Sequence, residues 1–328
     1  MRWLDAHLVR LPAWARVLLA TLCASAIASV AISTRGRGHA RTVPMDLPAG
    51  GPDAPAPQSS LPPLASNSVG CDQRRPWVVA DGALYIQTPR RVIAMAPDGR
   101  TAVLPPHVRR LWMEVGVYTR TDFWATLQKY PNEMRDLAIW GLEPNARLVE
   151  GHPAHEAVTL FNAAASDTEG SARFNLWSPT GASLQALGPA HARYLSVEQR
   201  SAPPPFFEVP VIRLETLLHL VPPGVRVEYL KVDAQGTDLR VLQGAGALLA
   251  RVEMVTAECQ DLPDRKDVRL FYADACLVKE LRAYMEAQGF VHQNCVMQNY
   301  DISEFNCHFG RSKEALERAT SLFAHEAW

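Results

Sequence analysis

The sequence predicts an α/β fold: a doubly wound, mostly parallel, Rossmann-like sheet of seven strands, preceded by a small β-hairpin extension. From residue 107 onward, short apolar runs alternate with helical patterns. The apolar runs are nearly continuous, as expected of strands that helices cover on both faces of a parallel sheet. In addition, 48% of the 328 residues are apolar, which is enough to form a large core.

The first 41 residues have the pattern of a targeting segment. An apolar run covers residues 17–33, with arginines on both sides. This run is only just long enough to cross a bilayer, and it also fits a signal peptide, for which Ala24 and Ala26 offer a cleavage site. Of three interpretations of this run, we favour a signal-anchor most, a cleaved signal next and a buried helix least. Both leading interpretations place the rest of the chain in the lumen of the secretory pathway, on an ER- or Golgi-like membrane, or outside the cell.

Two short regions separate this segment from the main domain. Residues 42–70 are rich in Pro, Ala, Ser and Gly and have no apolar period, which predicts an extended stalk. Residues 71–106 contain apolar runs around Asp81-Gly82 and Asp98-Gly99, which predict hairpins. Five cysteines follow the stalk, so an oxidising lumen would allow one or two disulfides and leave one thiol over. They are Cys71, Cys259, Cys276, Cys295 and Cys307.

Residues 107–328 form the predicted main domain, in which strands and helices alternate. The stretch 202–207 is expected to be a stiff connector, with a loop over the cleft as the alternative. The stretch 312–325 is expected to be a helix that packs on the domain, with a partner-binding helix as the lesser alternative. The predicted strands are 111–115, 137–142, 158–163, 226–232, 252–257, 290–295 and 305–309, and the predicted helices are 121–130, 146–152, 237–250 and 274–288.

Polar side chains stand where four of these strands end. A carboxylate that closes the second strand, Glu143, can accept both hydroxyls of a ribose because its two oxygens lie in one fixed plane. Any one of these groups could instead be a helix N-cap, but four such ends in chain order favour a nucleoside site. The groups are Glu114 and Gly116, then Glu143 and Asn145, then Ser166 and Asp167, then Asp233 and Gln235.

Three motifs in this region resemble the FkbM-type family of S-adenosylmethionine-dependent methyltransferases. They are the EPN triplet at 143–145, the A-x-S-D-x-x-G block at 164–170, and the block at 231–245 that begins K-x-D-x-x-G. The resemblance spans residues 110–309 and implies S-adenosyl-L-methionine as cofactor. It also implies that a hydroxyl is methylated on a glycan or another small hydroxylated acceptor.

The resemblance assigns roles to residues of this chain. Glu114 and Gly116 would lie beside the methionine part of the cofactor, and Glu143, in the triplet with Asn145, would bind the ribose. Ser166 and Asp167 would lie near the adenine. Asp233, with Gln235 beside it, would stand between the cofactor and the acceptor and take the proton of the hydroxyl. Glu258 would line the acceptor side.

Two departures from the family pattern keep alternatives open. The first loop lacks the family's second glycine and carries Tyr118 and Arg120 instead, while Gln235 replaces the Glu of many relatives. A non-catalytic binding module with the same fold is therefore one alternative. A membrane-tethered, metal-independent glycosyltransferase is another, and the absence of any D-x-D motif from the sequence counts against its metal-dependent counterparts.

The net charge and the spacing of the histidines bear on two classes of partner, nucleic acids and metal ions. A formal net charge of -1 gives no overall field that would attract nucleic acid, so none is predicted as a partner. The histidines are scattered and no H-E-x-x-H spacing occurs, so no metal site is predicted.

Overall fold

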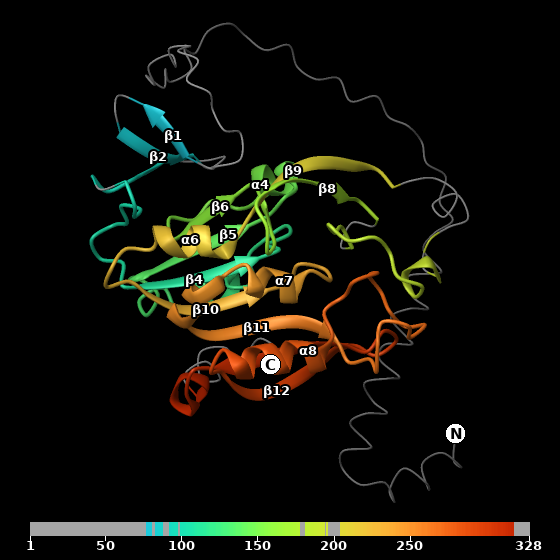
Figure 1. Ribbon diagram of the computed structural model, residues 1–328. Helices are drawn as coiled ribbons and strands as arrows, with labels where there is room; N and C mark the ends of the chain where they lie inside the picture. The colour runs from blue at the N-terminus through green and yellow to red at the C-terminus, as the bar shows by residue number, and fades with distance from the viewer. Residues whose placement is uncertain are drawn as a thin grey trace, which may run out of the picture. The chain divides into compact units, whose positions relative to one another are not determined.

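The computed structural model describes residues 77–80, 83–87, 92–97, 99–177, 181–193, 195 and 204–317, and Figure 1 shows their elements. The predicted targeting segment, the predicted stalk and Cys71 lie outside the described residues. No helix among the described residues is long and apolar enough to cross a membrane.

A seven-stranded sheet forms the centre of the domain, with the order β12-β13-β11-β10-β4-β5-β6. Its strands run parallel except β13, which is antiparallel to both of its neighbours, so the sheet is mixed but mostly parallel, as predicted. A short connection joins β12 to β13 and makes them a hairpin, which is how antiparallel neighbours can be linked. The strands are β4 (Arg110–Val115), β5 (Leu137–Leu142), β6 (Val158–Phe161), β10 (Arg226–Val232), β11 (Val252–Gln260), β12 (Val291–Asn299) and β13 (Glu304–Gly310).

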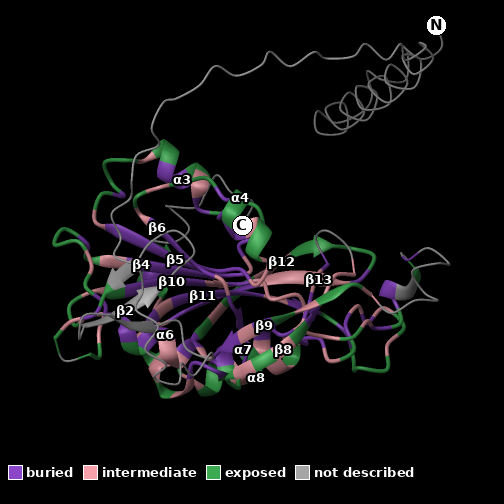
Figure 2. Ribbon diagram, turned by 90° about the horizontal axis from the view of Figure 1, so that it is seen from above, coloured by how far each residue is buried: buried purple, intermediate pink, exposed green. Residues whose placement is uncertain are grey.

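Helices cover both faces of this sheet, as the doubly wound prediction requires. Figure 2 shows α3 (Trp124–Lys129) and α4 (Ala146–Gly151) on one face and three helices on the other. Along β4, Leu111 packs in the core of the second face and Trp112 in the core of the first. Successive side chains of a strand point to opposite faces, so an apolar run is buried on both. The three helices are α6 (Leu214–Leu220), α7 (Asp238–Gln243) and α8 (Val278–Ala287).

A second, three-stranded sheet was not predicted. It has the order β7-β9-β8, formed by β7 (Ala164–Ala165), β9 (Phe206–Ile212) and β8 (Gly170–Asn175). Two predictions are therefore wrong. The third main strand ends at Phe161 rather than at residue 163, because the chain leaves the main sheet there and pairs with β9. Phe206 and Phe207 are not part of a connector but begin β9.

Two helices have boundaries in the structure that differ from those predicted. The helix predicted at 237–250 is divided into α7 and the 3-10 helix η2 (Gly246–Arg251), whose first residue, Gly246, has a φ of 53°. The helix predicted from residue 274 begins at Val278, because Leu277 forms a bridge with Gln260 of β11 and holds the preceding chain extended.

The predicted N-terminal extension is an antiparallel sheet of β1 (Trp77–Ala80), β2 (Ala83–Gln87) and β3 (Val92–Ala94). Ala80 pairs with Ala83, on either side of the turn predicted at residues 81–82, which lie outside the described residues. The second predicted turn is closed by a single bridge between Met95 and Ala102.

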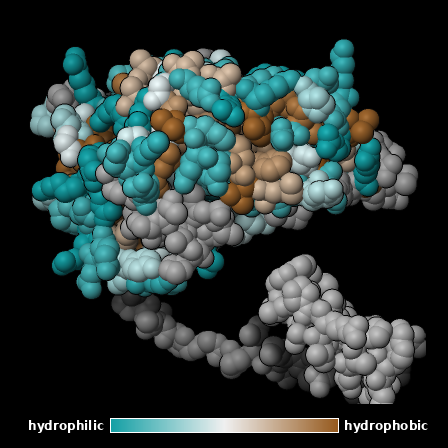
Figure 3. Space-filling model, turned by 90° about the horizontal axis from the view of Figure 1, so that it is seen from below, coloured by the Kyte–Doolittle hydropathy of each residue, from teal (hydrophilic) through white to brown (hydrophobic). Residues whose placement is uncertain are grey.

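The four described cysteines form two disulfides, Cys259–Cys276 and Cys295–Cys307, in agreement with the one or two that were predicted. On the face that Figure 3 shows, hydrophobic residues lie in small groups among hydrophilic ones. The large apolar side chains are mostly in the two cores that sandwich the sheet.

Candidate functional site

A cavity of about 1130 Å³ opens at the carboxyl ends of β4, β5 and β10. The chain winds from β4 through β5 to β6 in one direction and from β10 to β11 in the other. The cavity therefore lies at the topological switch point, where open α/β sheets bind their ligands. Strands β7 and β8 of the small sheet contribute an apolar wall, which includes Ala164, Ala165 and Phe174.

Gly116 lies where the ends of β4 and β10 come closest. Its φ is 86°, and a Cβ at this position would stand 1.9 Å from the backbone oxygen of Asp233. Any side chain would therefore strain the backbone and overlap with β10. Gly116 is consequently the residue that allows the first loop to fold over the end of the neighbouring strand.

Glu143 points into the cavity from the end of β5. It is 5% exposed, and its two carboxylate oxygens accept hydrogen bonds from the backbone amides of Tyr118 and Asn145, both at 2.8 Å. Burial raises the pKa of Glu143 to about 7, although the two amide donors lower it. A carboxylate has about four acceptor positions, so each oxygen can still accept a hydroxyl of a ligand.

Asn145 is an N-cap as well as a cavity residue. Its side-chain oxygen accepts from the amide of Arg147 at 3.2 Å, at the start of α4. The simple capping interpretation therefore holds for its side chain, while its backbone amide holds Glu143.

Glu114 lies beneath the first loop and does not line the cavity. It is fully buried and accepts from the hydroxyl of Thr121 and from the amide of Asp122, the latter at 3.1 Å. Burial raises its pKa to about 8, against the lowering effect of Lys231. The structure thus makes Glu114 a support for the first loop rather than a direct contact of a ligand.

The first loop accommodates its unusual residues by an unusual backbone. Tyr118 has a φ of 56°, which is uncommon for any residue but glycine, and its amide is the one that binds Glu143. Tyr118 and Arg120 both line the cavity. The residues by which the first loop departs from the family pattern are therefore part of the cavity wall.

Ser166 and Asp167 do not reach the cavity wall. They follow β7 of the small sheet, and the Ser166 hydroxyl donates to Asp167 at 3.1 Å. Asp167 is exposed, while the preceding alanines 163–165 line the cavity instead. The prediction took these two residues for the end of the third main strand, and the switch to the small sheet explains their different position.

Asp233 and Gln235 extend from β10 into the cavity. The Gln235 amide donates to Asp233 at 2.9 Å and to Glu258 at 3.2 Å, and Lys231 lies 3.4 Å from Asp233. Glu258 is inside β11 and is not on the cavity wall, so Gln235 separates it from the cavity. Burial, followed by the charges of Asp233 and Glu304, raises the pKa of Glu258.

Several residues of the site were not singled out from the sequence. Asp238 is fully buried and accepts from the amides of Ala234 and Gly236 at 3.0 and 3.1 Å, so it holds the turn after β10 in shape. Burial raises its pKa to about 8. Asp238 and Lys231 both stand in the block at 231–245, so their motif positions could have identified them.

Asn162 and Tyr272 also belong to the site, but they lie outside the three sequence motifs. The Asn162 amide donates to the backbone oxygens of Glu143 and Pro144 at 3.0 and 2.9 Å and fixes the loop after β5. The Tyr272 hydroxyl donates to Gln235 at 2.6 Å from a loop far along the chain. Only the tertiary structure brings these two side chains to the site.

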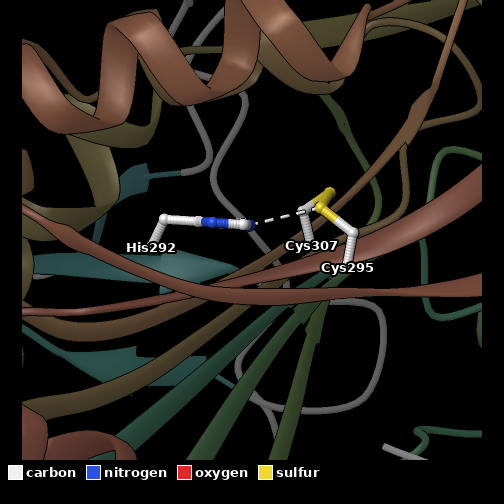
Figure 4. Close-up of side chains that lie close together, drawn as sticks. All are labelled: His292, Cys295 and Cys307. Atoms are coloured by element: carbon white, nitrogen blue, oxygen red, sulfur yellow. Dashed lines mark hydrogen bonds between the residues drawn. A yellow bond between two sulfur atoms is a disulfide. The ribbon is translucent and has the colours of Figure 1, made fainter.

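His292, Cys295 and Cys307 have atoms close enough together to bind a metal ion, and they are the single such group among the described residues. Figure 4 shows that the two sulfurs are bonded to each other, with Nε2 of His292 at 3.4 Å from the sulfur of Cys295. Thiolates are the sulfur ligands of metals, and a disulfide has none. The trio is therefore a cross-strand disulfide with a histidine beside it.

Comparisons with known proteins identify a family for this region. The model of the family described as "Methyltransferase FkbM domain" matches residues 114–291, more than half of the chain. Among solved structures, a match is found to the pyocyanin biosynthetic protein PhzM, with 13% identity and a TM-score of 0.30. It covers 64% of this chain and 52% of that one, so the chain spans about half the length of that protein. No curated protein matches the sequence.

Proposed function

Because the chain belongs to the methyltransferase FkbM domain family, we propose that it uses S-adenosyl-L-methionine to methylate a hydroxyl oxygen on a glycan or another small hydroxylated molecule. The observation that carries this proposal is the meeting of Gly116, Glu143 and Asp233 in one cavity at the switch point of the sheet. A nucleoside cofactor in an open α/β sheet is expected at this place.

The residues of the cavity fit this cofactor. Glu143 keeps acceptor positions for the two ribose hydroxyls, and the glycine at 116 lets the first loop lie directly against the backbone of Asp233 at the cavity. The volume of about 1130 Å³ exceeds the upper end of about 1000 Å³ for common ligand pockets, which supports room for an acceptor as well. When bound, the cofactor would supply a methyl group activated by a positively charged sulfur.

Asp233 is the residue that we propose takes the proton of the acceptor hydroxyl. Its side chain is 26% exposed and lines the cavity, so an acceptor can reach it. Gln235 and Lys231 hold its two oxygens in place. A carboxylate fixed in this way can orient a hydroxyl and remove its proton as the oxygen forms its new bond to carbon.

We place this reaction in the secretory pathway, with residues 17–33 as a signal-anchor or a cleaved signal. Two disulfides in the described part of the chain support an oxidising compartment, where such bonds persist. Family membership favours a methyltransferase over the glycosyltransferase alternative.

Transfer of a labelled methyl group tests the proposal. The purified full-length chain would be incubated with methyl-labelled S-adenosylmethionine and a panel of glycans and small polyols. We expect label in a hydroxylated acceptor, and a decrease by about 10²–10⁴-fold for Asp233→Asn, which removes the base but keeps the shape. Equal transfer by both proteins would contradict the role of Asp233, and cofactor binding with no transfer to any acceptor would favour the non-catalytic binding module.

A further inference from the structure

An apolar patch of partly exposed side chains lies on one side of the cavity. Two neighbouring segments of the chain provide it: the residues that follow β8, and a second segment around Ser183. The backbone amides of Asn175 and Ser183 each donate to the other residue's oxygen, at 2.9 and 3.0 Å, so the two segments lie side by side. The members of the apolar patch are Leu176, Trp177, Ala182 and Leu184.

The apolar patch is fixed beside the turn that carries Asp233. The buried Ser183 donates its hydroxyl hydrogen to the backbone oxygen of Gln235 at 2.6 Å. The same segment forms a bridge from Leu187 to Tyr272, which stands in the loop between β11 and α8, the Tyr272 loop. The Tyr272 hydroxyl in turn donates to the side chain of Gln235 at 2.6 Å. These contacts place the apolar patch next to the proposed base.

The donor is expected at a different part of the cavity wall. The alanines at 163–165 line the cavity after β6, beside Glu143. The Glu143 amide donates to the backbone oxygen of Phe161 at 3.1 Å, and the Asn162 side chain donates to the backbone oxygen of Glu143 at 3.0 Å. Because Glu143 is the proposed contact of the ribose, these alanines border the nucleoside. The apolar patch lies beside Gln235 instead and therefore borders the acceptor.

The apolar patch has no charge and little hydrogen-bonding capacity to offer an acceptor. Its single polar side-chain group, the indole N–H of Trp177, donates to the backbone oxygen of Gln185 at 3.2 Å. A hydroxyl or an ion pressed against these side chains would lose hydrogen bonds with water and gain none from them. An apolar group would be favoured there, because it leaves water.

The charged residues of the cavity lie elsewhere on its wall. Among the lining residues that the structure describes, they belong to the first loop or to the ends of β5 and β10, whereas those between 163 and 205 are all apolar. An acceptor is therefore bound between a polar side, which holds its hydroxyl, and an apolar side. The charged residues are Arg120, Asp122, Glu143, Lys231 and Asp233.

We propose that the apolar patch is the acceptor subsite, and that it selects an acceptor in which an uncharged aryl or alkyl group lies next to the hydroxyl that is methylated. The inference rests on the proposed function, because Asp233 locates that hydroxyl. It narrows the acceptor to glycosides and other alcohols that carry an apolar substituent. A glycan without such a substituent would leave the apolar patch in contact with water.

Matched acceptors that differ in one substituent test the proposal. The full-length chain would transfer a labelled methyl group from S-adenosylmethionine to the methyl, phenyl and carboxyphenyl glycosides of each sugar in a panel. The three members of a set offer the same sugar hydroxyls. We expect kcat/KM for the phenyl glycoside to exceed that for the methyl glycoside by about tenfold or more, chiefly through a lower KM. The carboxyphenyl glycoside should lose this gain, because its carboxylate would meet no partner on the apolar patch.

Two substitutions of Trp177 separate contact with the acceptor from support of the fold. Trp177→Gln removes the apolar ring and keeps an N–H donor, so it should lower the preference for the phenyl glycoside by about tenfold. Trp177→Phe keeps an apolar ring and removes the donor to Gln185, so the preference should remain. A Trp177 that acted only through its hydrogen bond would give the opposite order.

A second position in the apolar patch has a matched control outside the cavity. Leu184→Asn should also lower the preference, because it places a polar group in the patch. Leu248 of η2 is likewise partly exposed and packs on a core, but it does not line the cavity, so Leu248→Asn should leave the preference unchanged. Calorimetry should show the wild-type affinity for S-adenosylhomocysteine in all these variants, since the nucleoside lies beside Glu143.

The outcomes separate this inference from the function on which it rests. Equal kcat/KM for phenyl and methyl glycosides, an unchanged preference in Trp177→Gln, or a loss of affinity for S-adenosylhomocysteine in both Trp177→Gln and Leu184→Asn would each overturn the assignment of the apolar patch to the acceptor. A wild-type chain that methylates no member of the panel would overturn the proposed function itself.

Discussion

At the scale of single residues, Gly116 occupies a position where two backbone segments come too close together for any side chain. A Cβ there would lie 1.9 Å from the backbone oxygen of Asp233, and the φ of 86° is costly for any other residue. We predict that Gly116→Ala lowers the free energy of unfolding by about 2 kcal/mol or more, because strain and overlap both add. Denaturant unfolding of the full-length chain measures this change.

Gly151→Ala is a suitable control for that measurement. Gly151 ends α4, its backbone is not in the left-handed region, and nothing lies within 4 Å of a Cβ placed there. Alanine should be neutral or slightly stabilising at this position. Equal effects of the two substitutions would show that the approach of β4 to β10 is looser than the structure indicates.

The buried Glu114 makes the stability of the fold depend on pH. Burial raises its pKa from 4.5 to about 8 in the folded chain. A group with a raised pKa stabilises the fold below its unfolded pKa and loses this effect as the pH rises through the folded value. We therefore predict that the free energy of unfolding decreases between about pH 4.5 and pH 8, and that Glu114→Gln makes this decrease smaller.

Unfolding curves at several pH values test this prediction. Burial also raises the pKa of Glu143 to about 7 and that of Asp238 to about 8, so part of the decrease should remain in the Glu114→Gln variant. The account of Glu114 is wrong if the variant and the wild type lose stability in parallel over the whole range.

Some of the candidate site residues line the cavity and others do not, for a physical reason. Gly116, Glu143, Asp233 and Gln235 line the cavity, because the turn after a strand must face the edge of the sheet where ligands bind. Glu114 was assigned to the same loop but lies below it, since neighbouring residues of a strand point to opposite sides. A motif gives the position along the chain, whereas the direction of a side chain depends on packing.

At the scale of elements, the strands were predicted better than their connections. The predicted ranges 137–142 and 226–232 coincide with β5 and β10, because their apolar runs end at polar turns. The small sheet was missed because β7 has only two residues, Ala164 and Ala165, which continue the apolar run of β6. Its pairing with β9 is long-range, and no local pattern predicts such a partner.

The Cys259–Cys276 disulfide links two elements that shape the site. It closes a separation of 17 residues, for which chain entropy gives about 3 kcal/mol of stabilisation. We predict that replacing both cysteines by Ala lowers the free energy of unfolding by about that amount. It should also weaken the binding of S-adenosylmethionine, because the loop whose Tyr272 hydroxyl donates to Gln235 loses its anchor.

The second disulfide is the control for this prediction. Cys295–Cys307 joins β12 to β13, and neither strand carries the Tyr272 loop. Replacing these two cysteines by Ala should lower stability and leave the affinity for S-adenosylmethionine unchanged. An equal loss of affinity from this pair and from Cys259–Cys276 would contradict the specific link between the Cys259–Cys276 disulfide and the site.

At the scale of the whole molecule, family membership and the site agree on one reaction class. The matched residues 114–291 contain Gly116, Glu143 and Asp233, together with the Tyr272 loop. The motifs of the sequence predicted this domain. No sequence motif identifies the acceptor, because the loops and apolar walls that determine acceptor specificity come from distant segments of the chain.

The affinity of the full-length chain for S-adenosylmethionine tests the central claim most directly. Titration calorimetry should give a dissociation constant on the order of micromolar, as expected for a nucleoside in a preformed cleft. Glu143→Ala should weaken binding by about a hundredfold or more, because the variant lacks the buried carboxylate that accepts hydrogen bonds from the ribose hydroxyls. A wild-type chain that gives no heat with cofactor on the order of millimolar would contradict the account.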